Sequence, residues 1–480
     1  MGPIGPGSVD RPSVVVRRAV WRMPDARAAP TMGESIPAPR CPVSGLSTDL
    51  YELNMAASYL RRGMIGPATF SLFIRRLPGT RGYLVAAGLD DALDFLEDFR
   101  FDPGELSYLR DVLGFDEETV ERFADLRFSG DVWAIPEGRL VFADEPLLEV
   151  TAPIPEGQLA ETYLLNVITF QTAIASKAAR CVDAAADRGV FDFAFRRTQG
   201  PETAMRVARC ASIVGFAGTS NVEAARRFGL RTVGTMAHSY IQAFPTETDA
   251  FRAFAADFPR QTTFLVDTFD TLEGVRRAIE VARELGLEGG VGIRLDSGDL
   301  ASLAEASRHL LDEAGLTAAR IVASGSLDEY EIARLTSVGA PIDAFGVGTK
   351  MGVSADAPYL DSVYKLVEYG GRPVMKRSPA KETAPGPKQV WRRRQGAFDD
   401  ILALRGEQVP GDREPLLVPV MRAGRRIGRG DGLTAARTAF RHDLERLSDL
   451  ARRLDGPVPP AVGRSAALRT LVTDTERRLA

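Results

Sequence analysis

Between residues 190 and 350 short apolar runs alternate with amphipathic stretches, and this alternation constrains the fold more than any other feature. In one intervening stretch, Leu272, Val275, Ile279, Ala282 and Leu285 fall on one helical face. Apolar strands that alternate with helices predict a parallel sheet covered on both sides. The expected strands are FDFAF (191–195), SIVGF (212–216), RTVGTM (231–236), TFLVD (263–267), GVGIRL (290–295), RIVASG (320–325) and IDAFGVG (342–348).

Seven such strands favour a closed or nearly closed sheet. A dinucleotide-binding sheet would carry GxGxxG after its first strand, and this motif is missing there. We therefore predict an α/β protein with an irregular TIM-like (β/α) barrel over residues 176–355.

The flanking segments predict a second, mixed unit. Residues 45–175 read as an α+β domain that begins with a helix capped by Thr48, and residues 161–186 read as a long buried helix leading into the barrel. A hairpin around Gly370 and Gly371 is expected to return to this domain. The full division is a flexible tail over 1–44, the α+β domain over 45–175, the barrel over 176–355, the hairpin with a basic loop over 356–400, and a C-terminal helical region over 401–480 that packs outside the barrel.

Composition excludes several classes of protein. A net charge of −4 and a pI near 5.7 give no general attraction to nucleic acid, and the chain lacks an apolar run long enough to span a bilayer. Cys41, Cys181 and Cys210 lack metal-site or disulfide spacing, so the cytoplasm is the expected compartment. The Pro- and Gly-rich start is read as a tail or a misassigned start, with Met23 and Met32 as alternatives; a targeting peptide is the weaker interpretation.

Polar residues gather where the expected strands end, which is where active sites of parallel barrels lie. His238 is one of only three histidines, and Asp267 from the next strand could hold one of its ring nitrogens. A histidine packed in the core is the structural alternative. The strand-end residues are Arg196, Arg197, Thr219, Ser220, His238, Asp267, Arg294, Asp296, Asp299, Ser324, Gly325, Ser326, Gly348 and Thr349.

Two glycine-rich strand ends, SGSLDE (324–329) and GVGTKMG (346–352), suit phosphate because backbone N–H groups can approach it closely. They could equally be plain strand-to-helix connections. LDSGDL (295–300) offers carboxylates for Mg²⁺ with a diphosphate or for ribose hydroxyls, although Asp299 could instead cap a helix. Five of the six lysines lie between 350 and 388, which indicates either anion binding or a solvated loop.

These residues together resemble the nicotinate phosphoribosyltransferase family over roughly residues 45–400. Seven segments occur in the order of that family. They are STDLYELNMA (47–56), FDFAFRRTQGPETA (191–204), GFAGTSNV (215–222), GTMAHSYIQAF (234–244), LVDTFDT (265–271), IRLDSGDL (293–300) and FGVGTKMGV (345–353).

The resemblance implies a homodimer, with active sites at its interface, that joins nicotinate to phosphoribosyl pyrophosphate with coupled ATP hydrolysis. Mg²⁺ is expected with phosphoribosyl pyrophosphate and ATP, and no metal ligand set of the protein's own is assigned. The resemblance implies that His238 is phosphorylated, that Asp267 orients it, and that Asp296 contacts the ribose or its metal. It implies that Phe193 and, from the second subunit, Tyr51 sandwich the nicotinate ring, whose carboxylate meets Arg294. The implied phosphate contacts are a 5′-phosphate cradle of Gly325, Ser326, Gly348 and Thr349, and diphosphate or nucleotide contacts at Arg196, Lys365, Lys376 and Lys381.

Three other functions stay open. In the resemblance, enzymes for nicotinamide carry an acidic residue where this chain has Ser220, so nicotinate is favoured, with Arg294 and Arg197 to attract it. A phosphate-binding barrel lyase with a Schiff base on Lys350 or Lys177 is a second enzymatic interpretation. A catalytically silent scaffold that acts through its C-terminal helix is a third, and intact polar strand ends argue against it.

Overall fold

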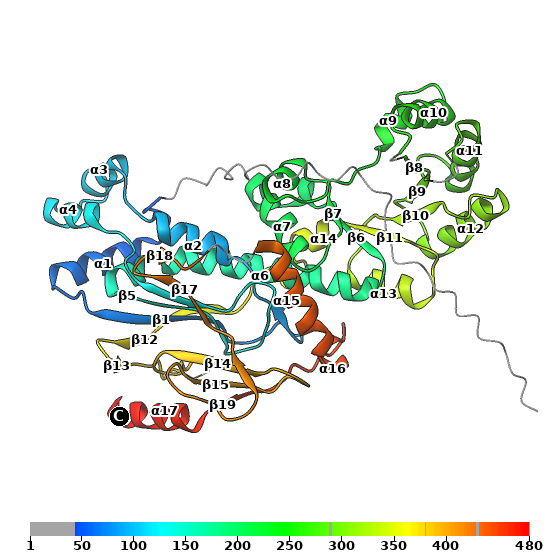
Figure 1. Ribbon diagram of the computed structural model, residues 1–480. Coiled ribbons are helices and arrows are strands. Elements are labelled where there is room, and N and C mark those ends of the chain that lie inside the picture. Colours follow the sequence, from blue (N-terminus) through cyan, green and yellow to red (C-terminus); the bar gives the residue numbers. More distant parts are fainter. Residues whose placement is uncertain (1–43, 261, 288–289, 380, 429–431, 480) are drawn as a thin grey trace, which may run out of the picture.

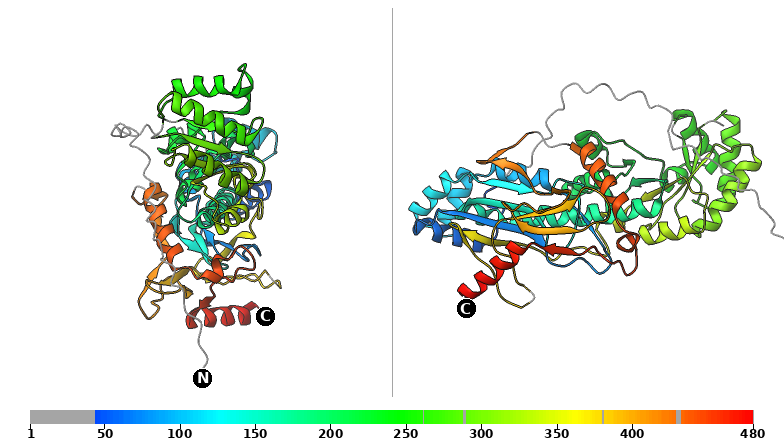
Figure 2. Two further views of the ribbon diagram at one scale, coloured as in Figure 1. Left: turned by 90° about the vertical axis from the view of Figure 1, so that its right-hand side faces the viewer. Right: turned by 60° about the horizontal axis from the view of Figure 1, so that its bottom comes forward.

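The computed structural model describes residues 44–260, 262–287, 290–379, 381–428 and 432–479. The tail expected over 1–44, with Cys41, Met23 and Met32, therefore lies outside the described residues, except for Ser44. The molecule is elongated, with an antiparallel sheet at one end and a curled parallel sheet at the other (Figure 1). The right-hand view of Figure 2 shows the same separation, and its left-hand view looks along the long axis of the molecule.

The first unit is built on a seven-stranded sheet of order β13-β12-β1-β5-β3-β17-β18, in which every pairing is antiparallel. The hairpin expected around Gly370 and Gly371 is present, and both glycines have the positive φ that a tight turn needs. Its first strand pairs with β1, so it does return to the N-terminal unit. The strands are β1 (Pro67–Ile74), β3 (Asp131–Ala134), β5 (Pro146–Pro153), β12 (Ser362–Tyr369), β13 (Arg372–Pro373), β17 (Val418–Arg422) and β18 (Arg425–Arg426).

Helices cover this sheet. The first helix begins at Leu50 with Asp49 as its N-cap residue, while the Thr48 hydroxyl donates to Glu52, so Thr48 is not the cap we expected. A short ladder of β2 (Leu84–Val85) and β4 (Leu140–Val141) lies beside the sheet. The helices are α1 (Leu50–Arg61), α2 (Leu89–Asp98), α3 (Pro103–Asp111), α4 (Glu117–Asp125) and α5 (Ile154–Leu159).

The long helix α6 (Glu161–Ala185) joins the two units, as its sequence predicted. Leu164 and Ile168 in its first half belong to the core of the antiparallel unit. Ala175 and Cys181 in its second half belong to the core of the parallel unit. The helix is buried on all sides from residue 171 to residue 181, and it therefore fixes one unit against the other.

The parallel sheet is an open half-barrel. Within the described residues its order is β7-β6-β11-β10-β9-β8, so β7 and β8 are edges and do not pair with each other. We predicted an irregular TIM-like barrel that is closed or nearly closed; the α/β class and the parallel sheet are confirmed, but the sheet curls only into a half-barrel. The strands are β6 (Gly189–Asp192), β7 (Gly218–Thr219), β8 (Thr263–Leu265), β9 (Gly292–Leu295), β10 (Arg320–Ala323) and β11 (Ala344–Val347).

Two expected strands account for this opening. The run SIVGF (212–216) instead contributes its first two residues to the end of α7 (Pro201–Ile213), and its Val214 and Phe216 are buried in the turn that follows. An apolar run buried in a helix cannot be told from a strand by hydropathy alone. RTVGTM (231–236) contributes only an isolated bridge between Thr232 and Thr219. The remaining helices of this unit are η1 (Phe195–Arg197), α8 (Val222–Phe228), α9 (His238–Gln242), α10 (Glu247–Asp257), α11 (Thr271–Glu284), α12 (Leu300–Glu313), α13 (Glu329–Ser337) and α14 (Thr349–Gly352).

The C-terminal region returns to both units. As expected, a helix packs outside the parallel unit: in α15 (Gly432–Arg446), Arg437 donates to the Ser212 carbonyl at the end of α7. The region is not purely helical, however, because it also supplies strands to a third sheet of order β16-β14-β15-β19. These elements are β14 (Lys388–Arg393), β15 (Asp400–Leu404), β16 (Arg413–Pro415), α16 (Asp449–Arg452), β19 (Val462–Arg464) and α17 (Ala466–Leu479). Across the described ranges, every helix is too short or too polar to cross a membrane.

Candidate active site

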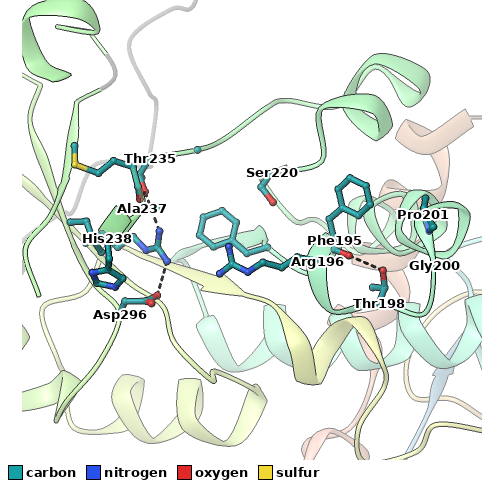
Figure 3. Close-up of a pocket in the computed structure, with 15 residues that line it drawn as sticks. Phe195, Arg196, Thr198, Gly200, Pro201, Ser220, Thr235, Ala237, His238 and Asp296 are labelled. Carbon is teal, nitrogen blue, oxygen red and sulfur yellow. Dashed lines mark hydrogen bonds and ion pairs between the residues drawn. The ribbon is translucent and has the colours of Figure 1, made fainter. Parts of the chain in front are cut away.

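A cavity of about 610 Å³ opens at the carboxyl ends of the parallel strands. His238 and Asp296 lie on one side of it and Ser220 and Phe195 on the other, with Arg196 extended between them (Figure 3). Its size is within the range of small-molecule sites. Six of the predicted residues line it together, namely Phe193, Arg196, Ser220, His238, Arg294 and Asp296.

His238 is half-buried at the start of α9, and its ring is held by a hydroxyl group. Its Nδ1 atom lies 3.0 Å from Thr268 Oγ1. The predicted partner, Asp267, faces the next loop instead, where its Oδ2 accepts from the Asp296 backbone N–H (3.1 Å) and the Ser297 hydroxyl (2.5 Å). In this structure Thr268, and not the expected Asp267, contacts the His238 ring. An imidazole held through Nδ1 presents Nε2 as its reactive nitrogen.

Arg294 is the most constrained side chain of the cavity. Its Nε donates to Ser324 Oγ (2.7 Å), Nη1 to Thr235 Oγ1 (3.1 Å) and Nη2 to Asp296 Oδ1 (2.6 Å). Its guanidinium carbon also lies 5.5 Å from the centre of the Phe193 ring. Because a guanidinium has five N–H donors, these contacts fix its orientation and still leave donors for a ligand.

Asp296 remains ionised beside this cation. Burial alone would raise the pKa of its carboxyl group, but the hydrogen bond from Ser324 and the charge of Arg294 outweigh burial and lower that pKa below its usual value. His238 is close enough to add to this effect. The cavity wall thus combines an anion, a guanidinium and an imidazole.

Asp192 is a site residue that the sequence analysis did not single out. It is buried at the end of β6, where its two carboxylate oxygens accept from the Ala194 backbone N–H (2.8 Å) and the Thr219 hydroxyl (2.7 Å). Its backbone carbonyl accepts from the Ser220 N–H at 2.9 Å. Burial raises the pKa of this carboxyl group. Asp192 therefore fixes the two loops that carry Phe193 and Ser220.

The glycine-rich turns lie directly beside the cavity rather than lining it. Gly325 has a φ of +90°, and a Cβ atom there would sit 1.8 Å from the Asp296 carbonyl oxygen, so only glycine fits. Ser326 also has a positive φ. A Cβ atom on Gly348 would lie 3.1 Å from the Phe193 carbonyl oxygen. The turn after β10 therefore touches the Asp296 loop, and the turn after β11 touches the Phe193 loop.

Other predicted residues lie away from the cavity. Tyr51 is 47% exposed on α1, at the end of the molecule opposite β8 and β9 (Figure 1). Lys365 on β12 lies 3.4 Å from Glu161 Oε1. Asp299 caps α12 by accepting from the Ala301 N–H, which is the structural alternative we had left open. The others, Arg197, Thr349, Lys376 and Lys381, are exposed and outside the cavity lining.

The two lysines of the lyase interpretation are both ion-paired outside the cavity. Lys177 is buried on α6 and donates to Glu329 Oε1 at 2.9 Å, while Lys350 lies 2.8 Å from Asp328 Oδ2. Burial would lower the pKa of Lys177, but Glu329 and Asp356 outweigh burial and raise it. An ammonium held in this way is a poor nucleophile, so the geometry disfavours a Schiff base.

Two residues that the sequence analysis passed over, Thr268 and Thr235, complete the site together with Ser324, which it had named as a strand end. Thr268 directly follows Asp267, and Ser324 precedes the glycine turn. Thr235 lies inside a segment expected to be a strand. The open parallel sheet carries a histidine, a guanidinium and a carboxylate around one cavity, with glycine turns beside it, and this arrangement is that of an α/β protein with a small-molecule site at its strand ends.

Comparison with known proteins gives the family. The profile of the nicotinate phosphoribosyltransferase N-terminal domain matches residues 46–169, and that of the nicotinate phosphoribosyltransferase family matches residues 189–400. The chain belongs to the nicotinate phosphoribosyltransferase family, which confirms the resemblance carried by the seven motifs.

Individual relatives agree over most of the chain. Nicotinate phosphoribosyltransferase pncB2 of Mycobacterium tuberculosis is 49% identical over 417 residues, or 86% of this chain and 89% of that protein. The Bacillus subtilis nicotinate phosphoribosyltransferase is 46% identical over 76% of this chain and 77% of its own. The crystal structure of human nicotinic acid phosphoribosyltransferase, at 30% identity, superposes with a TM-score of 0.80 over 89% of this chain and 99% of that one.

Proposed function

We propose that the protein joins nicotinate to phosphoribosyl pyrophosphate, giving nicotinate mononucleotide and diphosphate, with coupled hydrolysis of ATP. The observation that carries this proposal is Arg294, which is fixed over the Phe193 ring in the cavity that also holds His238 and Asp296. The extensive similarity to proteins named nicotinate phosphoribosyltransferase supports the same activity.

Nicotinate would bind by its ring and its carboxylate separately. Its pyridine ring would stack on Phe193, and its carboxylate would take the remaining N–H donors of Arg294. Ser220, on the opposite wall, is neutral and so does not repel an anion. The same arrangement leaves the amide of nicotinamide without a carboxylate acceptor at position 220, and we therefore favour the acid as substrate.

The transfer itself forms one bond and breaks one. The pyridine nitrogen of nicotinate forms a bond to the anomeric carbon with its lone pair, and the bond from that carbon to the diphosphate oxygen breaks. The pyridine nitrogen carries no proton to lose, so the step needs no general base. Negative charge grows on the leaving diphosphate, and Arg196, which lines the cavity, is placed to stabilise it. The turns at Gly325 and Gly348 would hold the 5′-phosphate, with Ser326 and Thr349 as hydroxyl donors.

The residues present also fit Mg²⁺ delivered with the diphosphate. Asp267 Oδ1 is buried without a hydrogen-bond partner among the described residues, and Asp296 keeps its carboxylate ionised nearby. Oxygen ligands of this kind suit Mg²⁺, which usually takes one or two carboxylates besides phosphate oxygens. Bound Mg²⁺ would neutralise charge on the leaving diphosphate.

We assign ATP coupling to His238. Its Nε2 would form a bond to the terminal phosphorus of ATP as the bond to ADP breaks, and water would later hydrolyse the N–P bond to release phosphate. Because His238 is not needed as a base for the transfer step, it is free for this role. A phosphorylated imidazole would change the local charge by about two units, which would be enough to rearrange the loop at residues 233–238 that leads into His238.

We further propose a homodimer that completes the site. Tyr51 lies on α1 and Lys365 on β12, and Lys376 and Lys381 follow β13. All four belong to the antiparallel unit, so they could act on the cavity only from a second copy of the chain. Tyr51 would then cover the face of the nicotinate ring opposite Phe193. The proposed compartment is the cytoplasm, and the two described cysteines are free thiols, as is usual there.

The test is a product assay with the purified chain. Nicotinate, nicotinamide and quinolinate would each be incubated with phosphoribosyl pyrophosphate and Mg²⁺, with and without ATP, and the mononucleotides separated by chromatography. We expect product from nicotinate, more of it with ATP, and an acid-labile label from terminally labelled ATP on His238. Preferred use of nicotinamide or quinolinate would refute the substrate assignment. A label at another residue would refute the role of His238.

A further inference from the structure

Five charged side chains meet in a buried cluster behind the glycine turns. Lys177 on α6 donates to Glu329 Oε1 (2.9 Å) and lies 3.0 Å from Asp356 Oδ1. Arg180, one helical turn further along, donates to the same Glu329 oxygen at 2.9 Å. Arg81 makes two hydrogen bonds to Asp356, at 2.9 and 3.0 Å. The side chains of Lys177 and Glu329 are 2% and 0% exposed, and that of Arg81 is fully buried.

The two carboxylates of this cluster belong to the two glycine-rich connections. Glu329 is the first residue of α13 and follows the turn at Gly325 and Ser326 by three residues. Asp356 follows α14, the helix that begins at Thr349 directly after Gly348. The Lys177 ammonium group therefore touches the continuation of both turns at one point. The two turns are otherwise carried by separate strands, β10 and β11.

The cluster is rigid because each member has more than one partner. Arg81 also donates to Ser354 Oγ (2.7 Å) and to the Ala173 carbonyl of α6 (2.9 Å). Burial would raise the pKa of Asp356, but Arg81 and Lys177 outweigh burial and lower it, so that its carboxylate stays charged. Three cations face the carboxylates of Glu329 and Asp356 here, and a third carboxylate, Asp328, is also within electrostatic range of Lys177, so the charges of the cluster are nearly balanced.

We propose that Lys177 is a positioning residue that sets the spacing of the two glycine turns and so determines affinity for the 5′-phosphate of the sugar substrate. This inference rests on the proposed function, because it takes the turns at Gly325 and Gly348 as the phosphate cradle. It goes beyond that function because Lys177 lies outside the cavity and touches no substrate. Its ligand class is a ribose 5-phosphate, and its effect passes through Glu329 and Asp356.

A second lysine links the same two turns from outside. Lys350 on α14 pairs with Asp328 of the other turn at 2.8 Å, but its side chain is 45% exposed. An exposed pair contributes little because water and salt screen it. The buried link through Lys177 should therefore control the spacing of the turns, and the Lys350 pair should matter much less.

The experiment measures binding of ribose 5-phosphate and of nicotinate separately by calorimetry in the full-length protein. For Lys177→Met we expect the Kd for ribose 5-phosphate to rise on the order of tenfold or more, because small displacements of a preorganised site are costly. The Kd for nicotinate should rise much less, because Arg294 keeps its hydrogen bonds to Thr235 and Asp296 even if Ser324, at the edge of the first turn, shifts. An unchanged Kd for ribose 5-phosphate would overturn the inference.

A matched control separates positioning from general stability. Lys388 is also buried, at 3% exposure, and pairs with a buried carboxylate, Glu149, in the antiparallel unit. Lys388→Met should lower the melting temperature but leave the Kd for ribose 5-phosphate unchanged. If it weakens ribose 5-phosphate binding as much as Lys177→Met does, the effect is not specific to the turns and the inference fails.

A second variant keeps the test decisive if Lys177→Met does not fold. Lys177→Gln is neutral and one bond shorter, so it can no longer join Glu329 to Asp356, but its amide can still donate to one carboxylate. Glu329 keeps Arg180 and Asp356 keeps Arg81 as cationic partners, which should preserve much of the stability. Ribose 5-phosphate should still bind weakly, and binding at wild-type strength in Lys177→Gln would contradict the inference. Failure of the wild type to form nicotinate mononucleotide would instead refute the proposed function, independently of these variants.

Discussion

The two sides of the cavity are held by different kinds of interaction. On the side that we call the histidine side, residues 233–238 and 267–269, hydroxyl groups make the contacts: Thr268 holds His238, and Thr235 holds Arg294. On the phosphate side, residues 324–329 and 348–356, buried ion pairs through Lys177 make them. The first set is half-buried, whereas the second lies in the interior.

This difference indicates that one side can move while the other serves as a frame. A neutral hydrogen bond contributes about 0.5–1.5 kcal/mol, so losing one to a new charge on His238 costs little. Removing one partner of a buried ion pair costs about 3–5 kcal/mol of folding stability. The histidine side is therefore suited to rearrange on phosphorylation, while the phosphate side keeps the sugar in place.

The largest effect is expected for His238→Ala. Removing the imidazole should abolish the gain in rate that ATP gives, a loss of roughly 100-fold or more in ATP hydrolysis, because the described lining of the cavity holds no second histidine to act as nucleophile. Transfer without ATP should persist, since the phosphate side is intact. The measurement is product formation with and without ATP. His309→Ala, an exposed histidine paired with Glu313 at 3.2 Å, should behave as the wild type. An equal loss with and without ATP in His238→Ala would contradict the division of roles.

Hydrogen exchange tests the comparison directly. Backbone amides of the histidine side should exchange faster than those of the phosphate side by on the order of 100-fold, because local opening there breaks weaker contacts. The measurement is mass spectrometry of peptides that cover residues 233–240 and 324–329. Equal protection of the two sides would contradict the difference in stability between the histidine side and the phosphate side. Slower exchange at residues 233–240 after incubation with ATP would show that the histidine side rearranges when His238 is phosphorylated.

The sequence predicted the strands that lead to the phosphate side better than the segments around the histidine side. The five strands β6, β8, β9, β10 and β11 were all found from apolar runs, because strands buried on both faces leave a continuous signal. β7 was missed because it has only two residues, Gly218 and Thr219, neither of them a strongly apolar strand former. The neighbouring run SIVGF was apolar for another reason, its burial at the end of α7 and in the turn that follows. The predicted barrel differs from the observed half-barrel because the run SIVGF does not form a strand and because RTVGTM forms only a single bridge, at Thr232.

The sequence predicted which residues gather at the site better than it predicted the contacts between them. The sequence placed six residues that do line one cavity, because strand ends of a parallel sheet converge. It could not decide between Asp267 and Thr268 as the partner of His238, since neighbouring residues in an irregular loop can face either way. It also could not bring Lys177 to Glu329, which lies 152 residues further along the chain.

Arg294→Lys should have the next largest effect, because it replaces a fork that makes three contacts by a single ammonium group. We expect the KM for nicotinate to rise about 10- to 100-fold, which corresponds to about 1.5–3 kcal/mol for lost charge-assisted hydrogen bonds. Discrimination against nicotinamide should fall by a similar factor, because the neutral amide of nicotinamide is attracted less strongly than a carboxylate by the charge of Arg294. The KM for phosphoribosyl pyrophosphate should change much less. Arg334→Lys, an exposed arginine paired with Glu331, serves as the control.

The smallest effect is expected for Thr268→Val, which keeps the shape of the side chain and removes the hydroxyl that contacts His238 Nδ1. Loss of one half-buried hydrogen bond, about 0.5–1.5 kcal/mol, should lower the ATP-dependent rate about 2- to 10-fold. Binding of ribose 5-phosphate and transfer without ATP should not change, because the phosphate side does not depend on Thr268. Asp267→Asn is the informative partner variant: if Asp267 rather than Thr268 orients the imidazole, that variant will lose ATP coupling but keep transfer without ATP, and Thr268→Val will keep both. Such a result would show that the histidine side is held by a charge after all, and the contrast between the two sides would disappear. Loss of transfer in Asp267→Asn even without ATP would instead fit the Mg²⁺ role of Asp267.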